Sequence, residues 1–360
     1  MRSGRRSQNR QKSEQKFIPQ RPEQERARLT PKPRKNESLV IFLLAFVLNL
    51  AAATLLSFYW QIGERNALTT TANGLLLFYT RESEISAFAL IHPPFATIAQ
   101  LVFIPLLKQL RLTFFAGPLL TSIIGAFSIV FLNLILLQQG MPLKYRWGFL
   151  LLTAVYPSFL YSSATGTAEA LFIFMLIFVL WGALQVAYNN MAFLICGFGL
   201  ALGFFADFRA VPLTIGLTLA LIVFEWRSGY EWKSELEGRL IAYITPIIYT
   251  MVLWLIFNAA EFDDAFYFVK QITTPTFSPA IARNATVLHP LFLGWENIFE
   301  AVWDTVRSLW QNSAIFLVTA AAALLPFFYK DRRSMRSILL ILFSVPIFMA
   351  IQIFTGALPS

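Results

Sequence analysis

The stretch LIHPPFATIAQLVFIPLL, residues 90–107, decides how many times the first third of the chain crosses a membrane. The segment is apolar, but Pro93 and Pro94 near its start and Pro105 near its end interrupt helix formation. Only about ten residues between them can form an unbroken helix, whereas a bilayer-spanning helix needs about 20. The sequence therefore predicts a juxtamembrane or re-entrant helix at 90–107.

Apolar runs outside this stretch are long enough to cross a bilayer. Hydrophobic residues make up 57% of the 360 residues, and charged residues make up 14%. Further spans are predicted at 38–60, 115–138, 147–163, 169–188, 191–207, 210–226, 239–258, 312–329 and 336–356. We therefore expect an all-α polytopic membrane protein with about nine or ten hydrophobic segments, in which residues 38–360 form one transmembrane domain.

Residues 1–37 differ from the rest of the chain. They carry twelve Lys or Arg against four Asp or Glu, and they contain no apolar run. This composition predicts a disordered tail. A basic tail directly before a membrane span marks the cytoplasmic side and contacts anionic lipid, and we favour this interpretation over a nucleic-acid partner.

Charge then predicts which loops share a side of the membrane. If 90–107 does not cross, the basic loops fall on the side of the tail, namely PLKYR (142–146), RSGYEWKSELEGR (227–239) and KDRRSMR (330–336). The opposite face receives a first outer loop (61–112), Glu169, the Asp207–Arg209 pair and a long outer loop (259–311). The sequence thus predicts a multi-pass cell-membrane protein. Its candidate functional residues lie on the extracytoplasmic face.

Polar residues at helix ends favour a surface site over a transport path. A transporter would hold such groups near the membrane midplane within broken helices. Neither an inverted repeat nor a charged residue at mid-span is visible in the predicted segments. A transporter is therefore the third hypothesis, after an enzyme and a non-catalytic membrane protein.

Four stretches carry a resemblance to a known class. They are NALTTTANGLLLFYTRESEISAFALIHPPFATIAQLVFIPLL (66–107), YPSFLYSSATGTAEALFIFMLIF (156–178), GFGLALGFFADFRAVPLTIGL (197–217) and FNAAEFDDAFYFVKQ (257–271). Their order and spacing resemble the GT-C glycosyltransferases, which include protein O-mannosyltransferases, aminoarabinose transferases and oligosaccharyltransferases. The resemblance implies a carboxylate in the first outer loop, at the mouth of a cavity that a polyprenyl-phosphate sugar donor enters from the lipid.

The first outer loop departs from that pattern at one position. Asn66 stands where the class has an Asp directly before Ala-Leu, and an amide cannot accept a proton. Glu64 is therefore the candidate catalytic base, and Asn66 is a candidate group for positioning the acceptor. On a helix the two side chains would point about 200° apart, so this exchange requires a rearranged loop.

Sugar transfer also requires stabilisation of the departing phosphate, for which Arg is well suited. The candidate phosphate partners are Arg65, Arg81 and Arg209. Glu169 and Asp207 are candidates to orient those arginines or to hold a divalent cation, and His92 is a candidate hydrogen-bond donor at the entry path. No metal site is assigned, and the acceptor and sugar are not specified. The alternative is a catalytically degenerate GT-C-like scaffold or a lipid-binding subunit of a complex, which Asn66 favours.

Overall fold

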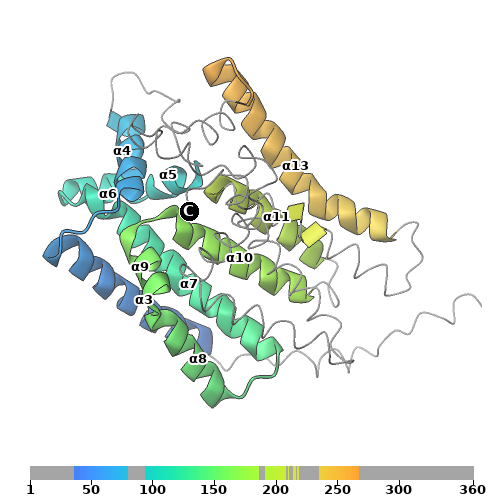
Figure 1. The fold of residues 1–360 in the computed structure, drawn as a ribbon, viewed down its shortest axis with the longest axis horizontal. Coiled ribbons are helices and arrows are strands. Elements are labelled where there is room, and N and C mark those ends of the chain that lie inside the picture. The colour runs from blue at the N-terminus through green and yellow to red at the C-terminus, as the bar shows by residue number, and fades with distance from the viewer. Residues whose placement is uncertain are drawn as a thin grey trace, which may run out of the picture.

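The computed structural model describes residues 36–79, 94–185, 191–207, 210, 214–215, 217–218 and 235–266. The elements within these ranges are helical (Figure 1). They are α3 (Glu37–Thr54), the π-helical turn η2 (Leu55–Tyr59), α4 (Arg65–Tyr79), α5 (Phe95–Gln100), α6 (Ile104–Gln109), the 3₁₀ turn η4 (Thr113–Phe115), α7 (Ala116–Gln138), α8 (Leu143–Val155), α9 (Pro157–Thr165), α10 (Ala168–Gln185), α11 (Met191–Ala206) and α13 (Glu235–Phe262).

Four described helices are long and apolar enough to cross a membrane. They cover Glu37–Tyr59, Thr113–Gln138, Ala168–Gln185 and Glu237–Phe262, and α11 is a shorter apolar helix. The prediction of an all-α membrane protein is confirmed at this level, and the four helices match the predicted spans 38–60, 115–138, 169–188 and 239–258. Residues 1–35 and the predicted spans 312–329 and 336–356 lie outside the described residues, as does most of 210–226.

The predicted span 147–163 is two helices, because the chain breaks at Tyr156. This residue is extended, with φ −61° and ψ 125°, and separates α8 from α9. The cause is Pro157, which lacks a backbone N–H and disfavours the α conformation in the residue before it. Since Pro is tolerated in a first helical turn, Pro157 begins α9 as readily as it ends α8.

The described part of 90–107 holds two short helices. Helices α5 and α6 have six residues each, so each is only about 9 Å long. Pro94 precedes α5, and Pro105 occupies the first turn of α6. Figure 1 shows α4, α5 and α6 gathered near the same end of α3 and α7.

Helices α3 and α7 are antiparallel neighbours. Ala53, near the end of α3, packs with Phe115 just before α7, whereas Ile41 packs with Ile129 in the second half of α7. The chain between these helices therefore leaves and returns to one end of the bundle. We call this the α4 end, and we call the opposite end, where α3 begins, the Glu37 end.

Small residues let α7 and α9 approach closely. An added Cβ on Gly125 would overlap Ser163, and one on Gly166 would lie 2.9 Å from the backbone of Gly117. Gly166 also has φ +82° and donates its N–H to Thr121 Oγ1 at 3.1 Å. Close approach at small residues is a common way for membrane helices to associate without a hydrophobic driving force.

A buried ion pair closes the Glu37 end of this helix group. The Arg146 guanidinium of α8 contacts the Glu37 carboxylate at the start of α3, and both side chains are almost fully buried. One guanidinium nitrogen, Arg146 Nε, has no hydrogen-bond partner among the described residues. The pair therefore joins the first residue of α3 to the first turns of α8.

Candidate functional site

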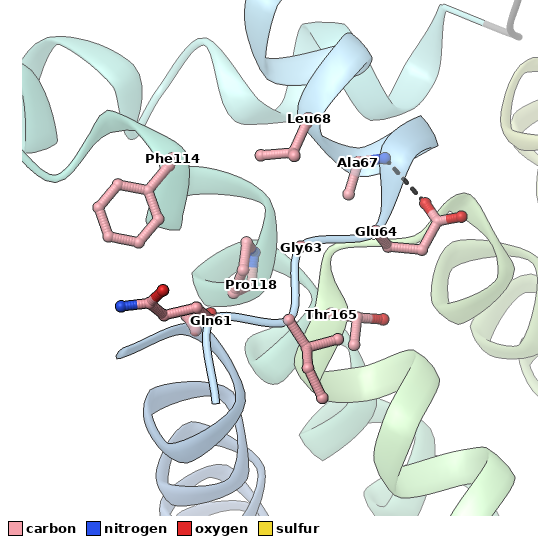
Figure 2. A pocket seen from close by; sticks show the side chains of 10 residues that line it. Gln61, Gly63, Glu64, Ala67, Leu68, Phe114, Pro118 and Thr165 are labelled. Atoms are coloured by element: carbon pink, nitrogen blue, oxygen red, sulfur yellow. Dashed lines mark hydrogen bonds between the residues drawn. The ribbon is translucent and has the colours of Figure 1, made fainter. Parts of the chain in front are cut away.

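A cavity of about 250 Å³ opens at the α4 end of the bundle (Figure 2). Its walls come from four separate parts of the chain: η2, the 61–64 segment with the start of α4, η4 with the start of α7, and the last residue of α9. They are Ser57, Gln61, Ile62, Gly63, Glu64, Ala67, Leu68, Phe114, Pro118 and Thr165. The cavity thus combines an apolar wall with hydroxyl, amide and carboxylate groups.

Glu64 lines this cavity and caps α4. Its Oε2 accepts the Ala67 N–H at 3.1 Å, and its backbone carbonyl accepts the Leu68 N–H at 3.0 Å. A carboxylate is favoured there because the first N–H groups of a helix lack intrahelical partners and carry partial positive charge. Figure 2 shows the carboxylate turned toward the start of α4, away from Phe114 and Gln61.

The other carboxylate oxygen of Glu64 is not held by the described residues. Oε1 makes no hydrogen bond to the described part of the chain, and the side chain is only partly buried. A carboxylate with one oxygen fixed by a backbone N–H and the other open can accept a proton from a nearby hydroxyl. Both the capping role and a role as a base are therefore compatible with one side-chain position.

Arg65 and Asn66 occupy the first turn of α4, directly after Glu64. Their side chains lie outside what the structure describes. Because α4 begins at Arg65, Glu64 stands at the cap position, whereas Asn66 stands within the helix. Arg81, His92 and Arg209 also lie outside the described residues, so the structure does not place three of the predicted site residues.

Glu169 and Asp207 lie at the same end of the bundle as Glu64. Glu169 is exposed in the first turn of α10, which follows the cavity residue Thr165 by a short turn. Asp207 is half-buried after α11 and donates its backbone N–H to the Gly203 carbonyl at 2.8 Å.

A small cluster connects these two positions. Leu171 of α10 and Ala206 of α11 pack together against Ala96 of α5, which places the start of α10 and the end of α11 side by side. In the described ranges, no group of three or more His, Cys, Asp or Glu side chains is placed to hold a metal ion.

The sequence analysis did not identify several polar residues at the α4 end of the bundle. Gln61 and Thr165 line the cavity, and Thr71 of α4 and Gln100 of α5 form a buried pair behind it. Lys108 of α6 lies 3.0 Å from the ring centroid of Tyr79 at the end of α4. In the sequence, the two residues of this pair are visible only as polar residues within TTTAN (69–73) and ATIAQ (96–100).

Comparisons with known proteins identify no relative of this chain. No family model, curated protein or solved structure matches the chain. The GT-C resemblance therefore rests on the quoted motifs alone.

Proposed function

We propose that the chain is an integral membrane glycosyltransferase that moves a sugar from a polyprenyl-phosphate donor to an acceptor at the extracytoplasmic face. The observation that carries the proposal is the position of Glu64. This residue lines a cavity at one end of the helix bundle, where four separate segments meet. A surface site of this kind suits a donor that arrives in the membrane and an acceptor that arrives from water.

The cavity supplies the base that the reaction requires. The acceptor hydroxyl must lose a proton as it attacks the anomeric carbon of the sugar, and Glu64 Oε1 is the proton acceptor in our proposal. The departing phosphate requires cationic partners, for which Arg65, Arg81 and Arg209 remain the candidates. None of the described lining residues is a Lys or Arg, so the phosphate partners in this proposal are those three arginines.

The arrangement of α3 and α7 supports an extracytoplasmic cavity. The basic tail immediately precedes Glu37, and Lys144 and Arg146 also lie at the Glu37 end. Since cytoplasmic loops are enriched in Lys and Arg, this end is cytoplasmic in our proposal and the α4 end is outside.

Sidedness can be measured with single-cysteine variants. Cys196 is the only cysteine, and it is buried, so a Cys196→Ser background leaves no native thiol to label. We expect Gln61→Cys and Glu169→Cys to react with a membrane-impermeant maleimide in intact cells. We expect Lys144→Cys to react only after permeabilisation. All three side chains are exposed in the structure.

The three positions form a matched set, because each reports on one end of the bundle without disturbing a buried contact. Labelling of Gln61→Cys and Lys144→Cys from the same side would contradict the antiparallel order of α3 and α7. Labelling of Lys144→Cys alone in intact cells would invert the protein and place the cavity in the cytoplasm.

A degenerate GT-C-like scaffold or lipid-binding subunit is the second candidate. The observation that favours it is the amide at Asn66, where the resemblance implies a carboxylate. The capping bond between Glu64 Oε2 and the Ala67 N–H adds to it, since this bond gives the carboxylate a structural role.

A reconstituted assay separates the two candidates. We expect the purified protein in proteoliposomes to transfer sugar from a mixture of polyprenyl-phosphate sugars and to retain polyprenyl phosphate in native mass spectrometry. A scaffold or lipid-binding subunit would retain the lipid and transfer no sugar. Transfer that stops on addition of EDTA would assign a divalent cation to the site, and unchanged transfer would exclude one.

A further inference from the structure

A fully buried polar pair lies next to the cavity, between α4 and α5. Thr71 is 4% exposed and Gln100 is 0% exposed. The Thr71 hydroxyl lies 2.7 Å from Gln100 Oε1 and donates a hydrogen bond to it. Buried polar groups in a mainly apolar protein are costly unless they are paired, so this contact joins the two helices at a defined point.

The pair is connected to Glu64 through one residue. The Thr71 hydroxyl also lies 3.0 Å from the carbonyl oxygen of Ala67, so its single proton is shared between two acceptors. The N–H of Ala67 is the group that Glu64 Oε2 accepts. Both the N–H and the carbonyl of Ala67 are therefore held, one by the carboxylate and the other by the Thr71–Gln100 pair.

The remaining half of the Gln100 amide has no hydrogen-bond partner in the part of the chain that the structure describes. Its Nε2 is buried without a hydrogen bond and lies beside Gly117, where an added Cβ would be 3.3 Å away. An apolar side chain at 100 would avoid an unpaired donor, so packing alone does not account for glutamine. The contact that glutamine does make is the one to Thr71.

We propose that Thr71 and Gln100 are positioning residues that hold the first turn of α4 and, through it, the Glu64 carboxylate. The pair anchors this turn to α5, which itself packs on the start of α7 beside the cavity. Without the anchor, the turn would fray and Glu64 would leave the Ala67 N–H. This inference rests on the proposed role of Glu64 as the base.

Carbodiimide labelling of Glu64, followed by mass spectrometry, measures the state of the carboxylate without any need for transfer. We expect Thr71→Val and Gln100→Leu each to raise the labelling rate of Glu64 roughly fivefold, which corresponds to about 1 kcal/mol. The double variant should label no faster than either single variant, because the two residues act in one chain of contacts. Thr71→Ser keeps the hydroxyl and should label like the wild type.

Thr250→Val is the matched control. Thr250 is also buried and its hydroxyl also donates to the carbonyl four residues before it, that of Pro246, at 2.7 Å in α13. This variant should leave Glu64 labelling unchanged. Wild-type labelling in Thr71→Val and Gln100→Leu would overturn the proposal, as would equal labelling of Thr71→Ser and Thr71→Val.

The labelling rate and the transfer assay together distinguish the positioning role of Thr71 and Gln100 from the proposed sugar transfer. If the protein transfers sugar, Thr71→Val and Gln100→Leu should lower kcat while leaving KM for the donor near its wild-type value. Absence of transfer with increased labelling would reject the enzyme and keep the positioning role. Transfer with unchanged labelling would reject the positioning role and keep the enzyme.

Discussion

Replacing Glu64 with glutamine is expected to remove most sugar transfer while the protein still folds and binds polyprenyl phosphate. Glutamine keeps the length of the side chain, and its carbonyl oxygen can still accept the Ala67 N–H that Glu64 Oε2 accepts at 3.1 Å. The change deletes only the proton acceptor. A general base contributes about 10²- to 10⁴-fold to a rate, so kcat in the proteoliposome assay should fall by that amount.

Two further variants complete this experiment. Glu237→Gln makes the same change at an exposed carboxylate in the first turn of α13, and it should keep most of the activity. Asn66→Asp restores the acidic residue that the resemblance implies, and it should preserve or raise activity. Full activity of Glu64→Gln would defeat the assignment of Glu64 as the base. A scaffold would show no transfer in the wild type and a trace, at most, in Asn66→Asp.

Replacing Glu37 with leucine is expected to destabilise the protein by about 3–5 kcal/mol, because it leaves a buried guanidinium without its carboxylate. Arg146 is 4% exposed, and its Nε already lacks a hydrogen-bond partner within the described ranges. The loss should appear as a lower unfolding temperature of the purified protein in detergent. The double variant Glu37→Leu with Arg146→Leu removes both charges and should recover much of the loss.

Glu169→Leu is the control for this measurement, since it deletes an exposed carboxylate from a helix start and should change the unfolding temperature little. An unfolding temperature of Glu37→Leu equal to that of the wild type would show that the pair is solvated in the protein. A double variant that is less stable than the single variant would show that the charges stabilise α3 against α8.

Sequence reasoning predicted the helical spans, and the roles of the site residues stay predictions. Long apolar runs determine the spans, because hydrophobic length is a property of one segment. The prolines around 90–107 predicted one short helix, and the described part of this stretch holds two, α5 and α6. The same reasoning gave too little weight to Pro157, which divides the predicted span 147–163 into two helices.

The cavity was harder to predict, because its walls come from segments far apart in sequence. Glu64 was selected for its charge, but nothing local in the sequence places Thr165 or Phe114 at the same cavity. The link between Thr71 and Gln100 joins residues 29 positions apart. Such contacts depend on the packing of α4 and α5, which composition and periodicity do not specify.

The π-helical turn η2 has a consequence for insertions and deletions in evolution. The Trp60 N–H donates to the carbonyl of Leu55, five residues earlier, so this turn holds one residue more than an α-helical turn. Loss of one residue here would restore regular α-helix and rotate everything that follows by about 100°. Gln61 would then face another direction, whereas α3 would keep its packed core. Deletion of one residue at this turn is therefore a single mutation that changes the cavity wall and leaves the packing of the helix bundle intact.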